Sequence, residues 1–419
     1  MIERKKYIEM ITPWIGKEKI IVLKWARQVG KTTLMQYFEK YLQQQNEQTA
    51  FIFADDLQNT FLDTPAHLIE YLKLKYGLWT SKKKLYVFID EFQYIKNAGL
   101  FLKNIFDAYK DSLQLIVSGS SSLEITKNTE FLTWRTITFY IDRLSFREVF
   151  SYTKGIDKTF QLPDIEEIKT FYTIFKHDLE LSFMNYLVYG GYPEWVITSQ
   201  KDIKEKVLWE ILKVYIEKDV SYFLKIENIK AFNDLIKLLA SNIGELVNIH
   251  ELSSILDISM QTVKKYLDIL EGTFIFSRVK PFFSNIRKEL SKMPKIFVED
   301  LAIRSYVLWD FSPLHDRINI GQEVENFIYN ELRKQKEKEK IYFYRTLAKS
   351  EIDFVLERKY QLYDLVEVKY RKKVPIPVSM KNFEKKYKVQ HKIIITKDIC
   401  EYKDGVYFLP ACVFGFVEV

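Results

Sequence analysis

The first third of the chain alternates short apolar runs with stretches in which apolar residues recur at helical spacing. The apolar runs have the length of buried strands, and they end in polar or acidic residues. Strands that alternate with helices predict an α/β fold with a parallel sheet, whose ligands bind at the carboxyl ends of the strands. The predicted elements are strands at 20–23, 49–56, 84–91 and 114–117 and helices at 1–20, 34–45 and 65–75.

The pattern changes beyond residue 154. Residues 155–230 are expected to be mostly helical, with an interruption at Gly190-Gly191-Tyr192-Pro193. Residues 231–300 contain two short amphipathic helices and then an apolar and basic stretch typical of strands. From residue 301 a helix precedes further strands. The expected elements of these parts are helices at 252–256, 260–267 and 321–334 and strands at 341–345, 351–356, 364–369, 392–396 and 405–410.

The composition narrows the class of protein. With 419 residues the chain is long enough for roughly two to four domains, each with its own core. No apolar run is long enough to span a membrane, and the basic start lacks a secretory apolar region. Cys400 and Cys412 are the only cysteines, which excludes a disulfide framework and a structural zinc site and indicates a cytoplasmic setting. The net charge of +7 is compatible with nucleic-acid binding but too small to establish it.

A phosphate-binding loop is predicted directly after the first strand. A strand, a loop, Gly30-Lys31-Thr32 and a helix form the context of a P-loop, in which backbone N–H groups and the helix N-terminus hold phosphate. Lys31 would reach the β- and γ-phosphates of ATP, and the Thr32 hydroxyl would bind Mg²⁺. Trp25 replaces the first glycine of the G-x-x-x-x-G-K-[ST] pattern and resists the tight turn. A strand-to-helix junction without a ligand is the alternative for this segment alone. The residues expected to contact the nucleotide are Arg27, Gln28, Val29, Gly30, Lys31, Thr32 and Thr33.

Two carboxylates end the apolar strand at 84–91. Asp90 would support the Mg²⁺ shell, and Glu91 would orient or activate the attacking water. A buried strand whose acids cap the next helix is the alternative. Because Gly-Lys-Thr lies upstream, we favour a Walker A and Walker B pair.

Five motifs occur in a fixed order along the chain. They are Arg-Gln-Val-Gly-Lys-Thr-Thr-Leu (27–34), Ile-Asp-Glu-Phe-Gln (89–93), Ser-Gly-Ser-Ser (118–121), Leu-Ser-Phe-Arg-Glu-Val-Phe (144–150) and Gly-Gly-Tyr-Pro-Glu (190–194). Together they resemble a prokaryotic AAA-type ATPase family that is abundant in archaea, and the resemblance covers nearly the whole chain. It implies an ATPase core at 1–154, a helical lid at 155–230, a winged-helix domain at 231–300 and a C-terminal restriction-endonuclease-like α/β domain at 301–419.

The resemblance also implies roles for single residues. Ser120 and Ser121 follow a strand where AAA-type ATPases place sensor 1, although either serine would equally serve as a helix N-cap. By the same resemblance, Pro193 would contact the adenine of ATP, and a plain helix-breaking turn is the alternative.

Trp134 and Arg135 stand where the family has a Gly-Arg pair. Arg135 is therefore the candidate arginine finger or sensor, with Arg143 and Arg147 as alternatives. Trp25 and Trp134 would both lie near the nucleotide, at positions where the family has glycine. This implies a site that binds nucleotide weakly or hydrolyses it slowly, or an indole that stacks on the ligand or the loop.

The helices at 252–256 and 260–267 have the apolar spacing of a helix-turn-helix, in which Leu252, Ile255 and Leu256 would pack against the second helix. Polar residues of the second helix would enter the major groove of DNA, and basic residues after it would contact phosphate as a wing. Packing against the rest of the protein is the alternative role of such a domain. The residues concerned are Gln261, Thr262, Lys264, Lys265 and Asp268 on the helix and Arg278, Arg287, Lys288, Lys292 and Lys295 in the wing.

Acidic residues of the last third are expected to converge at the mouth of a small sheet. Glu325 lies beside the apolar face of a helix, and Asp353 and Glu367-x-Lys369 lie on strands. This order resembles the PD-(D/E)XK nuclease motif, in which carboxylates bind one or two Mg²⁺ and the lysine orients or deprotonates the attacking water. Arg345 would bind the phosphate. The sequence leaves open whether this domain cuts, because alternating charges are common on amphipathic strands.

We therefore expect a cytoplasmic enzyme that binds and hydrolyses Mg-ATP. DNA is the expected partner besides ATP, and metal-dependent DNA cleavage is the second activity that the motifs imply. The alternative is a slow nucleotide-controlled regulator that binds DNA or protein and carries an inactive nuclease-like domain. AAA-type sites usually form between subunits, so an Arg135 that acts in trans would imply a homo-oligomer. The expected metal ligands are Thr32 and Asp90 in one site and Glu325, Asp353 and Glu367 in the other.

Overall fold

The computed structural model of the chain divides, by contacts between residues, into two compact units, residues 1–143 and 144–419. This division has no boundary near residue 230 or 300, where sequence analysis placed domain limits. The described residues are 2–24, 29–56, 59–78, 83–119, 134–198, 200–216, 226–282, 293–313, 317, 320–336, 340–346, 350–359 and 361–419.

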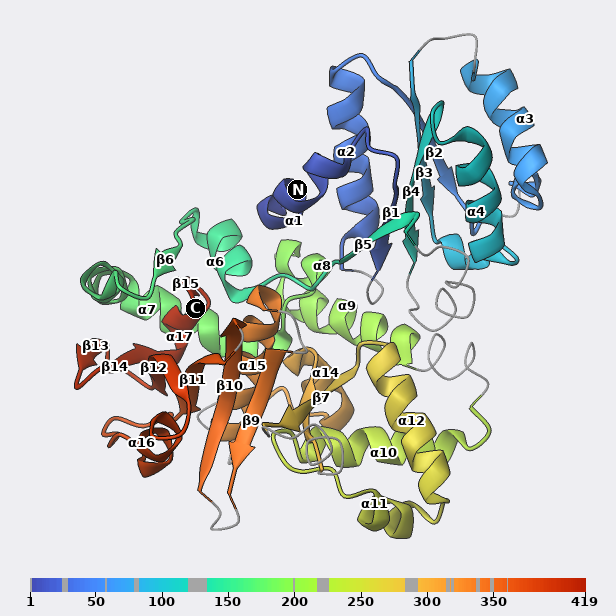
Figure 1. The fold of residues 1–419 in the computed structure, drawn as a ribbon. Coiled ribbons are helices and arrows are strands. Elements are labelled where there is room, and N and C mark those ends of the chain that lie inside the picture. The colour runs from blue at the N-terminus through green and yellow to red at the C-terminus, as the bar shows by residue number, and fades with distance from the viewer. Residues whose placement is uncertain are drawn as a thin grey trace. The chain divides into compact units, whose positions relative to one another are not determined.

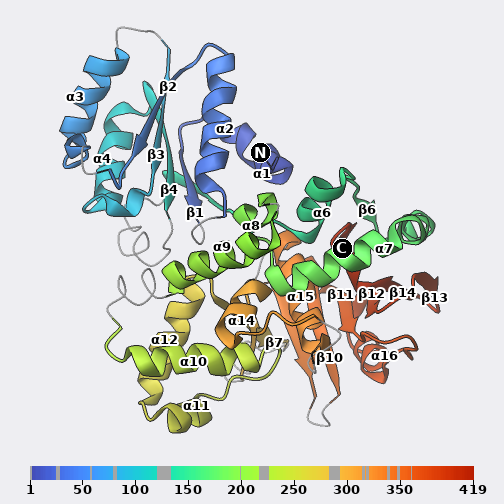
Figure 2. The same ribbon diagram turned by 180° about the vertical axis from the view of Figure 1, so that it is seen from behind.

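The first unit is an α/β domain built on a five-stranded parallel sheet. Its elements are α1 (Lys5–Ile11), η1 (Thr12–Trp14), β1 (Ile20–Lys24), α2 (Lys31–Gln44), β2 (Gln48–Phe53), η2 (Thr60–Leu62), α3 (Pro65–Tyr76), β3 (Leu85–Asp90), η3 (Phe92–Tyr94), α4 (Ala98–Tyr109), β4 (Leu113–Gly119) and β5 (Thr136–Tyr140). The strand order is β2-β3-β4-β1-β5, with α2 on one side of the sheet and α3 and α4 on the other (Figures 1 and 2). The prediction of a parallel α/β sheet is confirmed.

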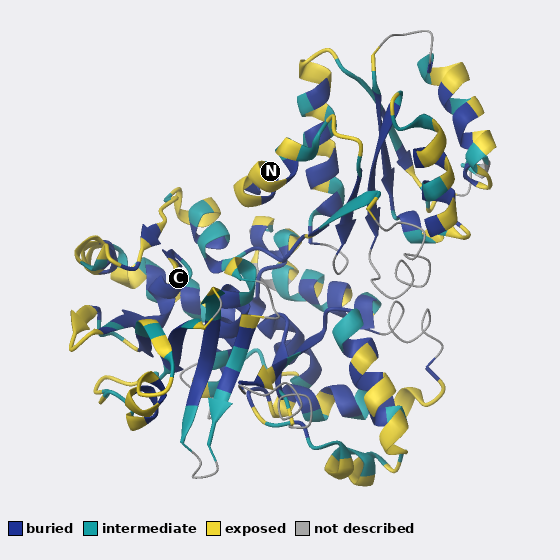
Figure 3. Ribbon diagram, viewed as in Figure 1, coloured by how far each residue is buried: buried dark blue, intermediate teal, exposed yellow. Residues whose placement is uncertain are grey.

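Two details of the first unit differ from the sequence-based expectation. The helix expected over 1–20 ends at Ile11, because Pro13 has no backbone N–H to continue it and lies in the 3₁₀ turn that follows, and Gly16 adopts a φ of +81°. Strand β5 was not predicted, and it completes the sheet beside β1. The core of this unit lies between the sheet and helices α3 and α4, and Figure 3 shows the strands as its most buried part.

The second unit contains an eight-stranded mixed sheet. Its elements are α6 (Phe146–Lys154), β6 (Phe160–Gln161), α7 (Ile165–Tyr189), α8 (Pro193–Ile197), α9 (Lys201–Lys213), α10 (Ile229–Ser241), α11 (Ile249–Leu256), α12 (Met260–Gly272), β7 (Phe276–Pro281), β8 (Lys295–Val298), α14 (Leu301–Leu308), α15 (Ile320–Gln335), β9 (Ile341–Arg345), β10 (Glu351–Lys359), β11 (Leu362–Val368), α16 (Val378–Glu384), β12 (Lys388–Thr396), β13 (Glu401–Lys403), β14 (Val406–Pro410), α17 (Ala411–Phe414) and β15 (Val417–Glu418). In the parts that the structure describes, no helix is both long enough and apolar enough to cross a membrane.

The strand order of the large sheet is β13-β14-β12-β11-β10-β9-β7-β8. Strands β7 and β8 are the predicted wing, and they form an antiparallel pair. They also join the strands that follow, because β7 pairs in parallel with β9. Strands β7 and β8 precede residue 300 and β9 follows it, so the domain boundary expected there would divide one continuous sheet. The pairing of β7 with β9 joins its two parts.

Helices α15 and α16 cover opposite faces of this sheet. Tyr329 of α15 stacks against Phe354 of β10, with 6.3 Å between the ring centroids. The next residue, Val355, points to the other face and shares a core with Met380 and Phe383 of α16. This packing fixes α15 against the strands that carry the predicted nuclease residues.

The expected helix-turn-helix corresponds to α11 and α12, which are joined by a turn in which Asp257 has a φ of +51°. Ser259 caps α12, since its hydroxyl accepts a hydrogen bond from the Thr262 backbone N–H at 3.1 Å. Val263 and Leu267 are buried, as expected, whereas Ile255 is 58% exposed. The expectation that Ile255 packs against α12 was wrong, because α11 has no fully buried residue.

Candidate nucleotide site and carboxylate cluster

Three strands of the first unit end at one edge of the sheet, with β4 between β1 and β3. Strand β1 leads into the predicted P-loop, β3 ends at Asp90 and β4 ends at Gly119. Because the strands are parallel, their carboxyl ends lie together, where α/β sheets bind ligands. The loop residues Trp25, Ala26, Arg27 and Gln28 lie outside the described part of the chain.

The end of the predicted P-loop forms the N-terminus of α2. Gly30 caps this helix with a φ of +93°, a conformation that glycine adopts without strain. Lys31 is the first residue of the helix and is buried, whereas Thr33 is exposed. The first turn of a 14-residue helix presents free N–H groups and a partial positive charge, so this end of α2 suits a phosphate group.

Asp90 connects α2 to two strand ends. The Thr32 hydroxyl donates a hydrogen bond to Asp90 Oδ2 at 2.5 Å, and the Ser118 hydroxyl donates one to Asp90 Oδ1. Asp90 itself is only 2% exposed, and its Oδ1 also accepts a bond from the Glu91 N–H at 3.1 Å. The predicted Walker A threonine and Walker B aspartate are thus in direct contact.

Glu91 directly follows β3 and has a φ of +52°. Its carboxylate accepts a hydrogen bond from the Gln93 side-chain amide. A left-handed backbone at a residue other than glycine is uncommon and costs free energy, and such residues are concentrated at functional sites. Gln93 is a contact that sequence analysis missed.

Ser118 lies near the end of β4, two residues before Ser120, and its hydroxyl contacts Asp90. Ser120 and Ser121 lie outside the described residues, and their role as sensor 1 stays a prediction. Sequence analysis included Ser118 in the Ser-Gly-Ser-Ser motif but gave it no role, whereas its buried hydroxyl donates a hydrogen bond to Asp90. The signal was its place beside Gly119, at the carboxyl end of the strand next to Walker B.

Arg135 and Trp134 lie at the opposite edge of the sheet. The Ile20 N–H, at the amino end of β1, donates to the Arg135 carbonyl at 2.9 Å. The Arg135 guanidinium makes two hydrogen bonds to Asp107 of α4, at 2.6 and 3.0 Å. The length of β1 separates this edge from the P-loop by about 15 Å. Arg135 therefore does not reach the P-loop of its own chain.

The expectation that Trp134 lies near the nucleotide was therefore wrong as well. Trp134 has a φ of +62° and is 62% exposed, and its ring lies over the Arg135 guanidinium at 4.4 Å. The positive φ gives a conformational reason for a glycine at this position, which does not involve the nucleotide.

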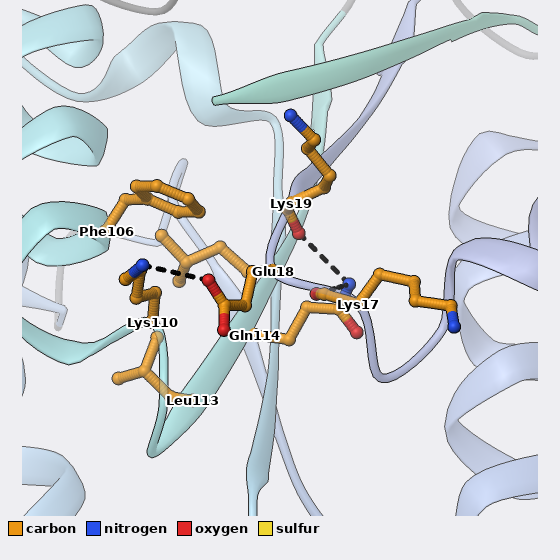
Figure 4. A pocket seen from close by; sticks show the side chains of 8 residues that line it. Lys17, Glu18, Lys19, Phe106, Lys110, Leu113 and Gln114 are labelled. Atoms are coloured by element: carbon orange, nitrogen blue, oxygen red, sulfur yellow. Dashed lines mark hydrogen bonds and ion pairs between the residues drawn. The ribbon is translucent and has the colours of Figure 1, made fainter. Parts of the chain in front are cut away.

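A hollow lies at the same amino-terminal edge (Figure 4). Lys110 forms an ion pair with Glu18 at 2.8 Å, and the Gln114 amide donates to the Lys19 carbonyl at 3.0 Å. These contacts tie the segment before β1 to the start of β4, so the hollow is not part of the nucleotide site. Its lining residues are Lys17, Glu18, Lys19, Phe106, Lys110, Leu113, Gln114 and Leu115.

Arg4 and Tyr7 hold α1 against the end of the P-loop. The Arg4 guanidinium donates to the Val29 carbonyl at 3.1 Å and to the Asp142 carbonyl at 2.7 Å. The Tyr7 hydroxyl donates to Asp142 Oδ2 at 3.2 Å. No motif marks these residues, so sequence analysis gave them no role.

Pro193 belongs to the second unit, where it begins α8. Gly190 before it has a φ of +68°, and the Gly191 N–H donates to Asp300 Oδ2 at 2.9 Å. This turn breaks the helical run as expected, and the contact of Pro193 with adenine stays a prediction.

The predicted nuclease residues of the second unit come together. The Lys369 ammonium lies 2.6 Å from Glu367 Oε1, and Asp353 Oδ2 accepts a bond from the Val368 N–H at 2.7 Å. The Asp353 N–H donates to Glu367 Oε2 at 3.4 Å. The expectation that these strands bring their charged residues together is met by the geometry, while their catalytic role stays a prediction.

Lys295 lies among the same carboxylates. It was expected to contact DNA from an exposed wing, but its side chain is only 5% exposed. Its Nζ lies 2.9 Å from Glu325 Oε1, 2.5 Å from Glu351 Oε1 and 4.0 Å from Asp353 Oδ1. The expectation was wrong because β8 joins the large sheet through β7 and turns this lysine inward.

Charge balance sets the protonation of this cluster. Burial raises the pKa of Glu325 to about 8 and that of Glu367 to about 7, and the charge of Asp353 adds to both shifts. Burial disfavours the charge of Lys295, but the carboxylates around it outweigh this and raise its pKa. Glu325 and Glu367 therefore keep their protons to a higher pH than exposed carboxylates do. Among the residues that the structure describes, no group of three or more His, Cys, Asp or Glu is arranged to hold a metal ion.

The outward face of α12, which was expected to contact DNA, is exposed. Its polar residues Gln261, Lys264 and Lys265 are exposed and Thr262 is half-buried. In the predicted wing, Arg278 is paired with Asp268 and Glu271, at 2.7 Å for the first of these. The other wing residues, Arg287, Lys288 and Lys292, lie outside the described ranges.

Three family models match the chain. Residues 17–150 match an AAA domain, residues 180–313 match a domain of unknown function (DUF8612), and residues 320–413 match another (DUF4143). The first match contains the P-loop, Asp90, Glu91 and Ser118. It supports an AAA-type P-loop ATPase core in the first unit.

Relatives among known proteins are distant. An uncharacterized protein of Haemophilus influenzae is 24% identical over 79% of this chain and 78% of its own length. Two uncharacterized proteins of Methanocaldococcus jannaschii are 25% and 26% identical, over 77% and 81% of this chain and 68% and 72% of theirs.

Two solved structures of the replication initiator DnaA are also similar. One, bound to AMPPCP and single-stranded DNA, is 13% identical over 65% of this chain and 90% of its own, with a TM-score of 0.30. The AMPPCP-bound protein of Aquifex aeolicus is 13% identical over 65% and 89%, with a TM-score of 0.28. At these TM-scores the similarity does not establish a common fold.

Proposed function

We propose that the first unit binds Mg-ATP and hydrolyses it. The observation that carries this proposal is the contact between Thr32 and Asp90 at the carboxyl edge of a parallel sheet. An isolated Gly-Lys-Thr sequence, or an acidic strand end by itself, would not require the two to meet. Their meeting beside the N-terminus of α2 is the arrangement that phosphate and Mg²⁺ together need.

The residues fit the nucleotide in distinct roles. Lys31 and the N–H groups of the first turn of α2 would hold the phosphates, and Thr32 and Asp90 would hold Mg²⁺. When bound, the metal ion neutralises charge that develops on the phosphates. Glu91 would orient the attacking water or accept its proton, and Ser118 would hold Asp90 in place.

Calorimetry with Mg-ATP and a turnover assay on the same sample test this proposal. The wild-type protein should bind and hydrolyse ATP, Lys31→Ala should lose binding, and Glu91→Gln should bind without turnover. Unchanged affinity in Lys31→Ala would exclude the P-loop assignment. Lys40→Ala, at an exposed position of α2, is a matched control and should behave as the wild type.

A nucleotide-controlled DNA-binding regulator is the second candidate, with a cytoplasmic location as expected for a chain without disulfides. The exposed Lys264 and Lys265 on α12 favour it, because cations on such a helix would contact DNA phosphates. An AAA domain is also compatible with a homo-oligomer in which Arg135 acts on a neighbouring subunit.

Binding of labelled duplex DNA, with and without Mg-ATP, tests the DNA-binding candidate, and Lys264→Ala/Lys265→Ala should weaken binding. Equal affinity of this double variant would exclude α12 as the DNA-binding surface.

A further inference from the structure

Lys295 occupies the place among the carboxylates that a divalent metal ion would need. Its ammonium is within hydrogen-bond distance of Glu325 and Glu351 and 4.0 Å from Asp353. A bound Mg²⁺ requires oxygens at about 2.1 Å in a near-octahedral arrangement. A metal ion on the same oxygens would lie beside the ammonium, and like charges so close repel strongly where water is excluded.

The lysine is built into the fold at this position. Its backbone pairs with Val279 in the β7–β8 ladder and bridges to Leu246. Its ammonium also lies 5.6 Å from the centre of the Phe343 ring, and the whole residue is 4% exposed. A flexible surface lysine can turn away from a site, but this one is buried and its backbone belongs to the sheet that carries Glu351 and Asp353.

The acids are likewise committed to partners other than a metal ion. Lys369, the lysine of the Glu-x-Lys pair, forms an ion pair with Glu367, and Asp353 accepts a hydrogen bond from the Val368 N–H. Arg345 was expected to bind phosphate, but its Nε lies 3.7 Å from Glu351 Oε2. Each carboxylate that the nuclease motif would offer to Mg²⁺ thus faces a cation or a donor of the chain itself.

We propose that Lys295 is the resident cation of this cluster, that it excludes divalent metal ions, and that the domain is a non-cutting structural unit. This inference is independent of the proposed ATPase, because the cluster lies in the second unit. A buried ion-pair cluster that links α15, β8 and β10 fixes the helix to the sheet, and loss of one partner leaves an uncompensated buried charge.

Mn²⁺ binding by calorimetry, without nucleotide, tests the proposal. Asp90→Asn is the parent for all variants, so that the proposed metal site of the first unit lacks its carboxylate. The parent and Lys295→Arg, which keeps the charge, should not bind Mn²⁺ at the cluster. Lys295→Met, which keeps the stem and removes the charge, should bind one Mn²⁺ at least about tenfold more tightly than any residual Mn²⁺ binding measured for the parent. A further Asp353→Asn change should abolish that binding.

Two results would overturn the proposal. One is Mn²⁺ binding by the parent that Asp353→Asn abolishes, since the cluster would then hold metal beside Lys295. The other is a folded Lys295→Met variant that binds Mn²⁺ no better than the parent. If Lys295→Met does not fold, the first comparison still decides, because it needs only the parent and Asp353→Asn, and a parent without Asp353-dependent binding supports the proposal. An inactive ATPase would change none of these readouts.

Discussion

The hydroxyl of Thr32 lies 2.5 Å from Asp90 Oδ2, across 58 residues of sequence. The contact joins the start of α2 to the end of β3. Strand β4 lies between β1 and β3, and its Ser118 hydroxyl donates to the other oxygen of Asp90. Both groups are oxygen donors, and hard cations such as Mg²⁺ prefer oxygen ligands. The contact therefore holds two predicted metal ligands together in advance.

Thr32→Val tests whether this hydroxyl serves the metal ion. The change removes the oxygen but keeps the shape of the side chain, so the fold should be retained. We expect the turnover of ATP to fall by at least about tenfold and the gain in nucleotide affinity on adding Mg²⁺ to disappear. Calorimetry with and without Mg²⁺ measures the second effect. Asp111→Asn, a charge change at an exposed position after α4, should leave both values unchanged. A Thr32→Val variant with full turnover would remove Thr32 from the site.

Gln93→Ala tests the bond between Gln93 and Glu91. A hydrogen bond to a charged group contributes about 1.5–3 kcal/mol, and here it directs the Glu91 carboxylate toward Gln93. If Glu91 must turn to the attacking water, loss of Gln93 should raise turnover several-fold at saturating ATP and leave the affinity for ATP unchanged. A fall in turnover would mean instead that Gln93 holds Glu91 in its working position. Steady-state kinetics on wild type and variant distinguish the two.

The sequence predicted the first unit well because each of its signals is local. Four apolar strands and the P-loop follow from adjacent residues, and the parallel sheet follows from their alternation with helices. Local signals do not predict the edge of the sheet at which a residue lies, because that edge depends on where the chain re-enters the sheet. Arg135 was assigned to the nucleotide by family resemblance, but it precedes an unpredicted strand and lies at the amino end.

Lys295 shows the same limit in the second unit. Three basic residues, Arg287, Lys288 and Lys292, precede it in the sequence, and such a run is typical of a surface wing. Its burial depends on the pairing of β7 with β9, two strands separated by about 60 residues that belong to different predicted domains. The acids Asp353 and Glu367 were found because strand alternation is a local rule, but their cation comes from elsewhere in the chain.

The two cysteines give a pH-dependent test of the second unit. Burial raises the pKa of Cys400 to about 12 and also raises that of Cys412. Both thiols should therefore stay protonated and react slowly with a thiol reagent at pH 8 in the native state. An unfolded chain has thiols with a pKa of about 8.5, so stability should fall as pH rises above that value. Fast native labelling of either cysteine would contradict this burial, and Cys400→Ser identifies which thiol reacts.

Trp134 offers a test in which glycine should stabilise more than alanine. At a φ of +62° a side chain costs about 1 kcal/mol that glycine does not pay. Trp134→Gly and Trp134→Ala both lose the ring that lies over Arg135, so the comparison between them isolates the backbone. We expect the free energy of unfolding in urea to be about 1 kcal/mol higher for the glycine variant than for the alanine variant. The unfolding transition of the first unit is the one that Mg-ATP should shift to higher urea concentration. At Lys40 inside α2 the order should reverse, because glycine weakens a helix interior. If alanine were the more stable choice at both positions, the left-handed backbone at Trp134 would not be the reason for a glycine there.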